Sequence, residues 1–121
     1  MKEEKEKEEA ILICDFLEIE PIDGIYHNSY KYPKGIQIML NYSRTIDDLH
    51  FINNWQWLME VVLKIEKLNY TTQMEYVSEL GYYFRIYKGY NEIIKVIPYE
   101  TKIKSVYKGC INFIKRYNST K

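Results

Sequence analysis

Histidine and cysteine, the side chains best suited to catalysis and metal binding, are few and far apart in this sequence. The chain has two histidines and two cysteines, with no Cys-x-x-Cys or His-x-x-x-His spacing. Polar or helix-capping roles explain His27 and His50 more simply than metal binding does. Cys14 and Cys110 fall on apolar helical stripes, which predicts buried thiols and not nucleophiles. We therefore expect no metal site and no cofactor.

Catalytic motifs built on other residue types are also missing from the sequence. Ser43, Ser78 and Ser105 lack a Gly-x-Ser-x-Gly context, and no glycine-rich phosphate loop is present. Asp47 and Asp48 form an acidic pair, but the start of a helix favours negative charge and explains the pair better than acid–base catalysis. The sequence therefore predicts a protein that is not an enzyme.

Tyrosine is the most unusual component of the chain. Thirteen tyrosines accompany two tryptophans and four phenylalanines among 121 residues. Tyrosine is enriched in the hot spots of protein interfaces, because its ring is apolar and its hydroxyl group is polar. Alternation along a predicted strand at residues 82–88 places Tyr83, Arg85 and Tyr87 on one face and apolar side chains on the other.

The face with Tyr83, Arg85 and Tyr87 is the predicted partner-binding patch, together with Lys88 and Tyr90 in the turn that follows. Only one face of the strand needs to pack against helices, so this face is expected to be exposed. Aromatic and basic side chains together suit a protein partner or stacked single-stranded nucleic acid. The alternative is that both faces are covered and the tyrosines fill the edges of the core.

Charge is distributed unevenly, although the formal net charge is zero. Residues 1–20 carry a net charge of −5, and residues 87–121 carry +6. A basic end can mark a binding surface. Two solvated helices that attract each other weakly explain the same asymmetry more simply.

The first half of the chain predicts an acidic helix followed by a hairpin. Residues 2–17 place apolar side chains at helical spacing, and turn-forming residues follow from Pro21 onward. Residues 25–32 are a predicted edge strand. Residues 36–40 alternate like a second strand, which would pair with the first across the turn at 33–35.

Residues 46–69 show the strongest helical pattern. Thr45 or Asp47 is expected to cap this helix. Trp55 begins one apolar stripe, whereas Trp57 lies about 200° away around the helix, on a second apolar face. Such a helix is either buried between layers or anchors a partner, so Trp57 is a further candidate partner-binding residue.

The second half of the chain predicts strands and a closing helix. Strands are expected at residues 74–77, 82–87 and 92–97, with Pro98 ending the last one. A helix follows at 101–117, in which Gly109 either permits close packing or is simply tolerated. The element order predicts an α+β fold, with three helices packed on an antiparallel sheet of about four to five strands. Residues 1–121 are expected to form a single domain.

The sequence also limits where the protein is expected to act. No apolar run approaches the ~20 residues that a membrane helix needs. No apolar signal-peptide core follows the charged N-terminus. We therefore expect a cytoplasmic protein with reduced cysteines and no membrane partner.

Residues 55–66 read Trp-Gln-Trp-Leu-Met-Glu-Val-Val-Leu-Lys-Ile-Glu. This segment resembles the Trp-x-Trp-Leu-Met-x-Val-Val-x-Lys-Ile-Glu signature of a family of small, mostly uncharacterised proteins from phages, prophages and mobile elements of Bacteroidota. Residues 11–17 and 104–118 are similar to the opening and closing helices of that family. Glu60 and Leu63 depart from the pattern, which commonly has proline and glutamate there, and the tyrosine-rich middle does not align.

The resemblance implies a mobile-element protein that acts in the host cytoplasm. Small phage proteins without an active site often occupy or misdirect host machinery, so the implied function is inhibition of a host defence system. One such role is that of an anti-CRISPR protein, which would block an RNA-guided nuclease or its guide RNA loading. The alternatives are a sponge for a nucleotide second messenger and a structural or assembly factor that forms homo-oligomers through Trp57.

Overall fold

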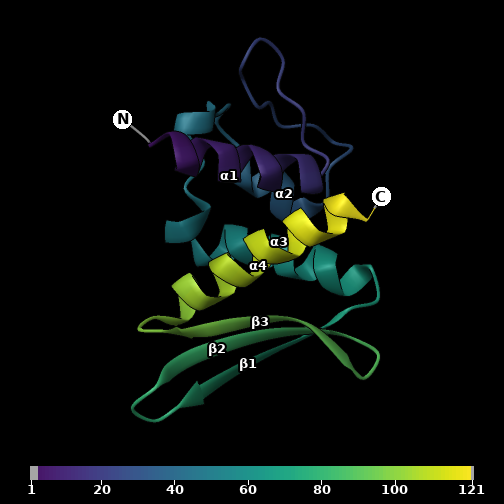
Figure 1. Cartoon of the computed structure of the whole chain (residues 1–121). Helices are drawn as coiled ribbons and strands as arrows, with labels where there is room; N and C mark the ends of the chain where they lie inside the picture. The colour runs from purple at the N-terminus through teal and green to yellow at the C-terminus, as the bar shows by residue number, and fades with distance from the viewer. Residues whose placement is uncertain (1–2, 121) are drawn as a thin grey trace. The chain divides into compact units, whose positions relative to one another are not determined.

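The computed structural model describes residues 3–120 and has an α+β fold (Figure 1). Its helices are α1 (Glu4–Phe16), α2 (Lys34–Met39), α3 (Trp55–Lys67) and α4 (Lys102–Ser119), with short 3₁₀ helices η1 (Ile46–Asp48) and η2 (Phe51–Asn53). Its strands are β1 (Thr71–Val77), β2 (Gly81–Lys88) and β3 (Asn91–Tyr99). The fold class and the antiparallel sheet are confirmed, but the described residues form three strands and not four or five.

The chain contains two compact units, which divide after Glu60 inside helix α3. The first unit holds α1, α2, both 3₁₀ helices and the start of α3. The second unit holds the rest of α3, the sheet and α4. That the whole chain forms a single domain stays a prediction. Within residues 3–120, no helix is both long and apolar enough to cross a membrane.

Helix α1 follows the predicted pattern. Ile13 and Cys14 on its apolar stripe are buried, whereas Glu4 lies in the first turn, where the helix dipole favours negative charge. The helix ends at Phe16, and Glu18 then takes a left-handed conformation with a φ of 61° that turns the chain. The predicted start at residue 2 lies outside the described residues.

The predicted hairpin over residues 25–41 is wrong, because residues 34–39 form helix α2. Ile36 and Met39 are 3% and 1% exposed, whereas Ile38 is 62% exposed. Burial therefore follows the spacing of a helix turn and not the alternation of a strand. Residues 25–32 form no strand either, since they contribute only isolated bridges, one of which joins Tyr26 to Arg44.

The predicted long helix over residues 46–69 begins later than expected, at Trp55. The side-chain oxygen of Asn54 accepts a hydrogen bond from the backbone N–H of Trp57 at 3.0 Å and caps the helix start. The chain before it bends because Leu49 and Phe51 are both buried. Residues two apart lie about 200° apart around a helix, so a continuous helix would point one of these side chains away from the core.

The predicted cap Thr45 begins η1 and not the long helix. Its hydroxyl group and backbone N–H both bond the carboxylate of Asp48, at 3.1 and 3.3 Å. Asp48 is the third residue of η1, and its carboxylate and the Thr45 side chain form a capping box across this single turn. The prediction that Thr45 caps the long helix is therefore wrong. Asp47 pairs instead with Lys7 of α1 at 3.7 Å.

All three strands predicted in the second half are confirmed, and each extends beyond its predicted bounds. Gly89, with a φ of 62°, forms the tight turn that joins β2 to β3 in antiparallel pairing. Pro98 does not end β3, because it lies within Asn91–Tyr99. β3 is an edge strand with a register shift near Pro98, so the missing N–H group is tolerated there.

Helix α4 begins at Lys102, one residue after the predicted start, and the hydroxyl of its N-cap Thr101 accepts a hydrogen bond from the backbone N–H of Lys104 at 3.3 Å. It packs on one face of β2 and β3 within the second unit (Figure 1). A Cβ atom at Gly109 would collide with the ring of Phe84 and would lie 3.1 Å from Val96. The close-packing interpretation of Gly109 is therefore correct, and the glycine sets the distance between helix and sheet.

Candidate functional site

Neither histidine lies in a helix or strand. His27 is exposed, and its Nδ1 atom lies 3.4 Å from the Ser43 hydroxyl oxygen. His50 is also exposed and directly precedes η2. Within residues 3–120, no group of three or more His, Cys, Asp or Glu side chains could hold a metal ion.

Both cysteines are buried, as the sequence predicted. Burial raises the pKa of the Cys110 thiol far above its usual range, so this side chain behaves as an apolar group. Cys14 contacts the hydroxyl group of Tyr26, which is itself only 5% exposed. Together, burial and the neighbouring Cys14 and Asp15 raise the pKa of Tyr26 to about 12, and burial has the largest effect.

The raised pKa of Tyr26 predicts a loss of stability in alkali. The neutral phenol is favoured in the folded chain, so its contribution is complete below pH 10.0, the ordinary pKa, and falls as the pH rises toward about 12. We expect the stability advantage of the wild type over Tyr26→Phe to shrink by about 2 kcal/mol across this range. Urea unfolding of both chains at several pH values measures it, and a constant difference would contradict it.

The second unit brings together the central residues of the predicted patch. Tyr83, Arg85 and Tyr87 lie on the face of β2 opposite Phe84 and Ile86, which are buried. α4 packs on the Phe84 side, so the Tyr83 side is the face that α4 leaves open. The three side chains are half-buried rather than fully exposed, because neighbouring strands flank them.

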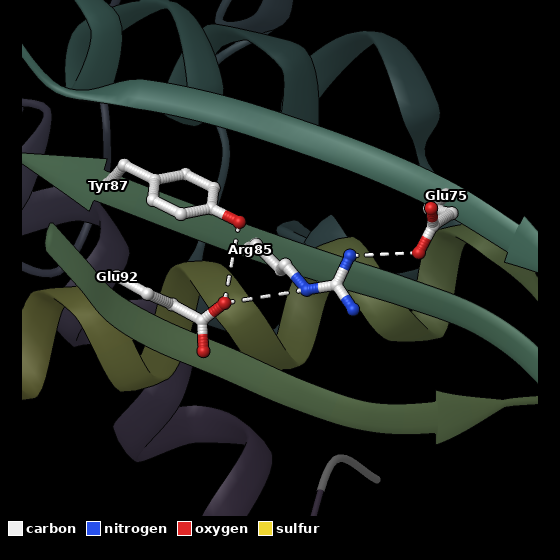
Figure 2. Close-up of polar contacts among 4 residues, drawn as sticks. All are labelled: Glu75, Arg85, Tyr87 and Glu92. Atoms are coloured by element: carbon white, nitrogen blue, oxygen red, sulfur yellow. Dashed lines mark hydrogen bonds and ion pairs between the residues drawn. The ribbon is translucent and has the colours of Figure 1, made fainter. Parts of the chain in front are cut away.

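Arg85 is the centre of this face and is held from both neighbouring strands (Figure 2). Its Nη1 atom donates a hydrogen bond to Glu75 of β1 at 2.8 Å, and its Nε atom lies 3.5 Å from a carboxylate oxygen of Glu92 in β3. The same Glu92 oxygen accepts a hydrogen bond from the Tyr87 hydroxyl at 3.4 Å. The bond to Glu75 raises the pKa of Arg85 further above its ordinary value, so the guanidinium stays charged.

Tyr83 lies beside two cations. The Cζ atom of Arg85 is 5.1 Å and the Nζ atom of Lys95 is 6.0 Å from the centre of the Tyr83 ring. Both distances lie at or within the ~6 Å reach of a cation–π interaction. Ile97, on the same side of β3 as Lys95, is 71% exposed and adds an apolar group beside the aromatic row.

We refer to these seven residues as the Arg85 face: Glu75, Tyr83, Arg85, Tyr87, Glu92, Lys95 and Ile97. Sequence reasoning identified the three from β2 by alternation but missed the four from β1 and β3. Alignment of the two hairpins across their turns would have placed Glu75 next to Tyr83 and Glu92 next to Tyr87. A register shift between Ile86 and Tyr87 then brings Lys95 opposite Arg85, and the sequence pattern did not predict that shift.

The other predicted site residues do not join the Arg85 face. The Nζ atom of Lys88 lies 5.3 Å from the centre of the Tyr70 ring, and that ring contacts Phe113 of α4, so Lys88 is on the helix side of the sheet. Tyr90 is fully exposed at the turn between β2 and β3. Trp57 belongs to the first unit and is engaged there. Its ring packs edge-to-face on Phe51 and lies 4.8 Å from the Cζ atom of Arg44.

The Arg85 face combines rigid aromatic groups with balanced charge. Its two cations, Arg85 and Lys95, are matched by the carboxylates of Glu75 and Glu92. Side chains held in one geometry lose little conformational entropy on binding, which favours recognition of a flat polar and aromatic surface. No known protein family, curated protein or solved structure matches the chain.

Proposed function

We propose that this chain is a non-catalytic binding protein that holds a protein partner on the Arg85 face. The observation that carries the proposal is the fixation of Arg85 by two carboxylates from two neighbouring strands. Arginine and tyrosine are frequent hot-spot residues in protein interfaces. Here they are placed in one geometry before any partner arrives, which lowers the entropic cost of association.

The charge balance of the face favours a protein over a nucleotide or nucleic acid. A phosphate group is bound best by cations whose donors are free. The Arg85 guanidinium contacts two carboxylates, which would repel a phosphate at the same place. A sponge for a nucleotide signal is therefore the weaker candidate for this surface.

The proposed partner is a protein of a host defence system, and the proposed source of the chain is a phage or mobile element. This choice is supported by the resemblance of residues 55–66 to the Bacteroidota phage and prophage family. An RNA-guided nuclease of a CRISPR system, or its guide-loading step, is the specific target we propose. Inhibition would come from occupying a surface of the nuclease, with no chemistry performed by the inhibitor.

The decisive experiment measures binding and inhibition with a Tyr83→Thr/Tyr87→Thr double variant. Threonine keeps a high strand preference, so the sheet should form while both rings are lost. We expect affinity for the partner, taken from a panel of purified CRISPR nucleases and from host lysate, to fall at least tenfold. The loss follows because truncation of a hot-spot residue typically removes more than about 1.4 kcal/mol of binding free energy.

A matched control is available in two tyrosines of the first unit. Tyr30 and Tyr42 are 99% and 77% exposed, so Tyr30→Thr/Tyr42→Thr removes the same groups elsewhere on the surface. The control should bind like the wild type, and circular dichroism should show that both double variants remain folded. Equal binding by wild type and the Tyr83/Tyr87 variant would exclude the Arg85 face. Recovery of RNA or nucleotide in place of protein would support the sponge instead.

A further inference from the structure

The two edges of the sheet differ in how well they are protected against further strand pairing. β3 carries Pro98 and Lys95 and has two register shifts against β2, all of which hinder the addition of another strand. β1 pairs with β2 in unbroken register from Thr71 to Val77 and contains neither proline nor lysine. β1 therefore lacks the proline, the lysine and the register shifts that protect β3.

Side chains on the helix side of β1 are also incompletely buried. Met74 is 38% exposed and Tyr76 is 61% exposed, although Phe84 and Tyr82, their neighbours in β2, lie on the side that α4 packs against. Leu80, in the turn that follows β1, is 59% exposed. Exposed apolar side chains therefore lie along the β1 edge, and a strand added there would shield these side chains from water.

We propose that β1 pairs antiparallel with β1 of a second copy of this chain, with Met74 on the two-fold axis. In that register Met74 faces its own equivalent, and Gln73 faces Glu75 of the other copy. Tyr76 then faces Thr72, and Val77 faces Thr71, so all seven residues of the strand are paired. Glu75 is the single charged residue of β1, and its carboxylate meets an amide that can donate a hydrogen bond.

Neighbouring symmetric registers are less favourable. Directly opposite residues in an antiparallel pair point to the same face of the sheet. The two-fold axis must therefore pass through a residue and not between two residues, so the nearest alternative registers are centred on Glu75 or Gln73. An axis at Glu75 would set two carboxylates directly opposite each other, which is destabilising. An axis at Gln73 would leave Tyr76 and Val77 without partners. The register centred on Met74 is the one that opposes no like charges and uses the whole strand.

A cysteine at position 74 tests both the association and its register. In the proposed pair, Met74→Cys brings two thiols together across the axis, with Cα atoms about 4.5–5.5 Å apart, within the range of a disulfide. Gln73→Cys is the matched control, because its equivalents are offset by about 7 Å along the strands as well as across them. The native cysteines are both buried and should not compete.

We expect Met74→Cys to form a disulfide-linked species of twice the 14.7 kDa chain mass in air-saturated buffer, at least tenfold faster than Gln73→Cys. Equal rates for the two variants, or no crosslink in either, would overturn the proposal. This outcome is independent of the Arg85 face, because a monomeric chain could still bind a partner through that face.

Solution mass gives a second readout that needs no oxidation. Sedimentation of the wild type at about 1 mM should show a dimer, and Met74→Lys should return it to the monomer mass, since two ammonium groups would meet at the axis. Ile22→Lys, at an isoleucine of the first unit that is 66% exposed, should remain dimeric. A monomeric wild type, or a dimer that survives Met74→Lys with circular dichroism unchanged, would overturn the proposal.

Discussion

Ile36→Ala is expected to lower the free energy of unfolding by about 2–4 kcal/mol, whereas Ile38→Ala is expected to change it by less than about 0.5 kcal/mol. Ile36 is 3% exposed and would leave a cavity, because its neighbours are held in place by the surrounding core. Ile38 is 62% exposed and loses little contact with the protein. Urea unfolding of the two variants beside the wild type measures both values.

The pair of variants separates a helix from a strand at residues 34–39. In a strand, Ile36 and Ile38 would point to the same side of the sheet, and both substitutions would have similar costs. In helix α2 they lie about 200° apart, so the costs differ as their burial does. Losses of equal size would contradict the helix, and a large loss at Ile38 alone would reverse the assignment of its faces.

The sequence was ambiguous here because the segment is short. Ile36, Ile38 and Leu40 fit alternation, while Ile36, Met39 and Leu40 fit a helix turn equally well, and periodicity over a few residues cannot choose between them. The choice is made by burial, which depends on how the segment packs in its unit. Met39 and Leu40 are 1% and 0% exposed, and that observation requires the tertiary structure.

The strands of the second half were predictable for a physical reason. Their sequences are rich in aromatic and β-branched residues, and Gly89 provides the tight turn between two of them, so local preference and tertiary pairing agree. Alternation in β2 then identified Tyr83, Arg85 and Tyr87 as one face. Lys95 was not predictable as the residue opposite Arg85 by the same means, because a register shift between Ile86 and Tyr87 brings it there.

Gly109→Ala is expected to lower the free energy of unfolding by about 1–3 kcal/mol, although alanine is the better helix former by about 1 kcal/mol. The added methyl group would collide with the ring of Phe84 and press on Val96, both of which are 2% exposed. Neither neighbour can turn toward solvent, so α4 must move away from β2 and β3. Thermal and urea unfolding of the variant measure the loss.

An exposed position of α4 shows how alanine and glycine compare where no neighbouring side chain is in the way. Lys115 is exposed, so Lys115→Ala should be more stable than Lys115→Gly by about 1 kcal/mol, the ordinary helix preference. Combining Gly109→Ala with Phe84→Leu removes the ring carbons that the methyl group meets. The double variant should therefore lose less stability than the two single variants added together. Strict additivity, or stabilisation by Gly109→Ala alone, would show that the spacing between α4 and the sheet is set elsewhere.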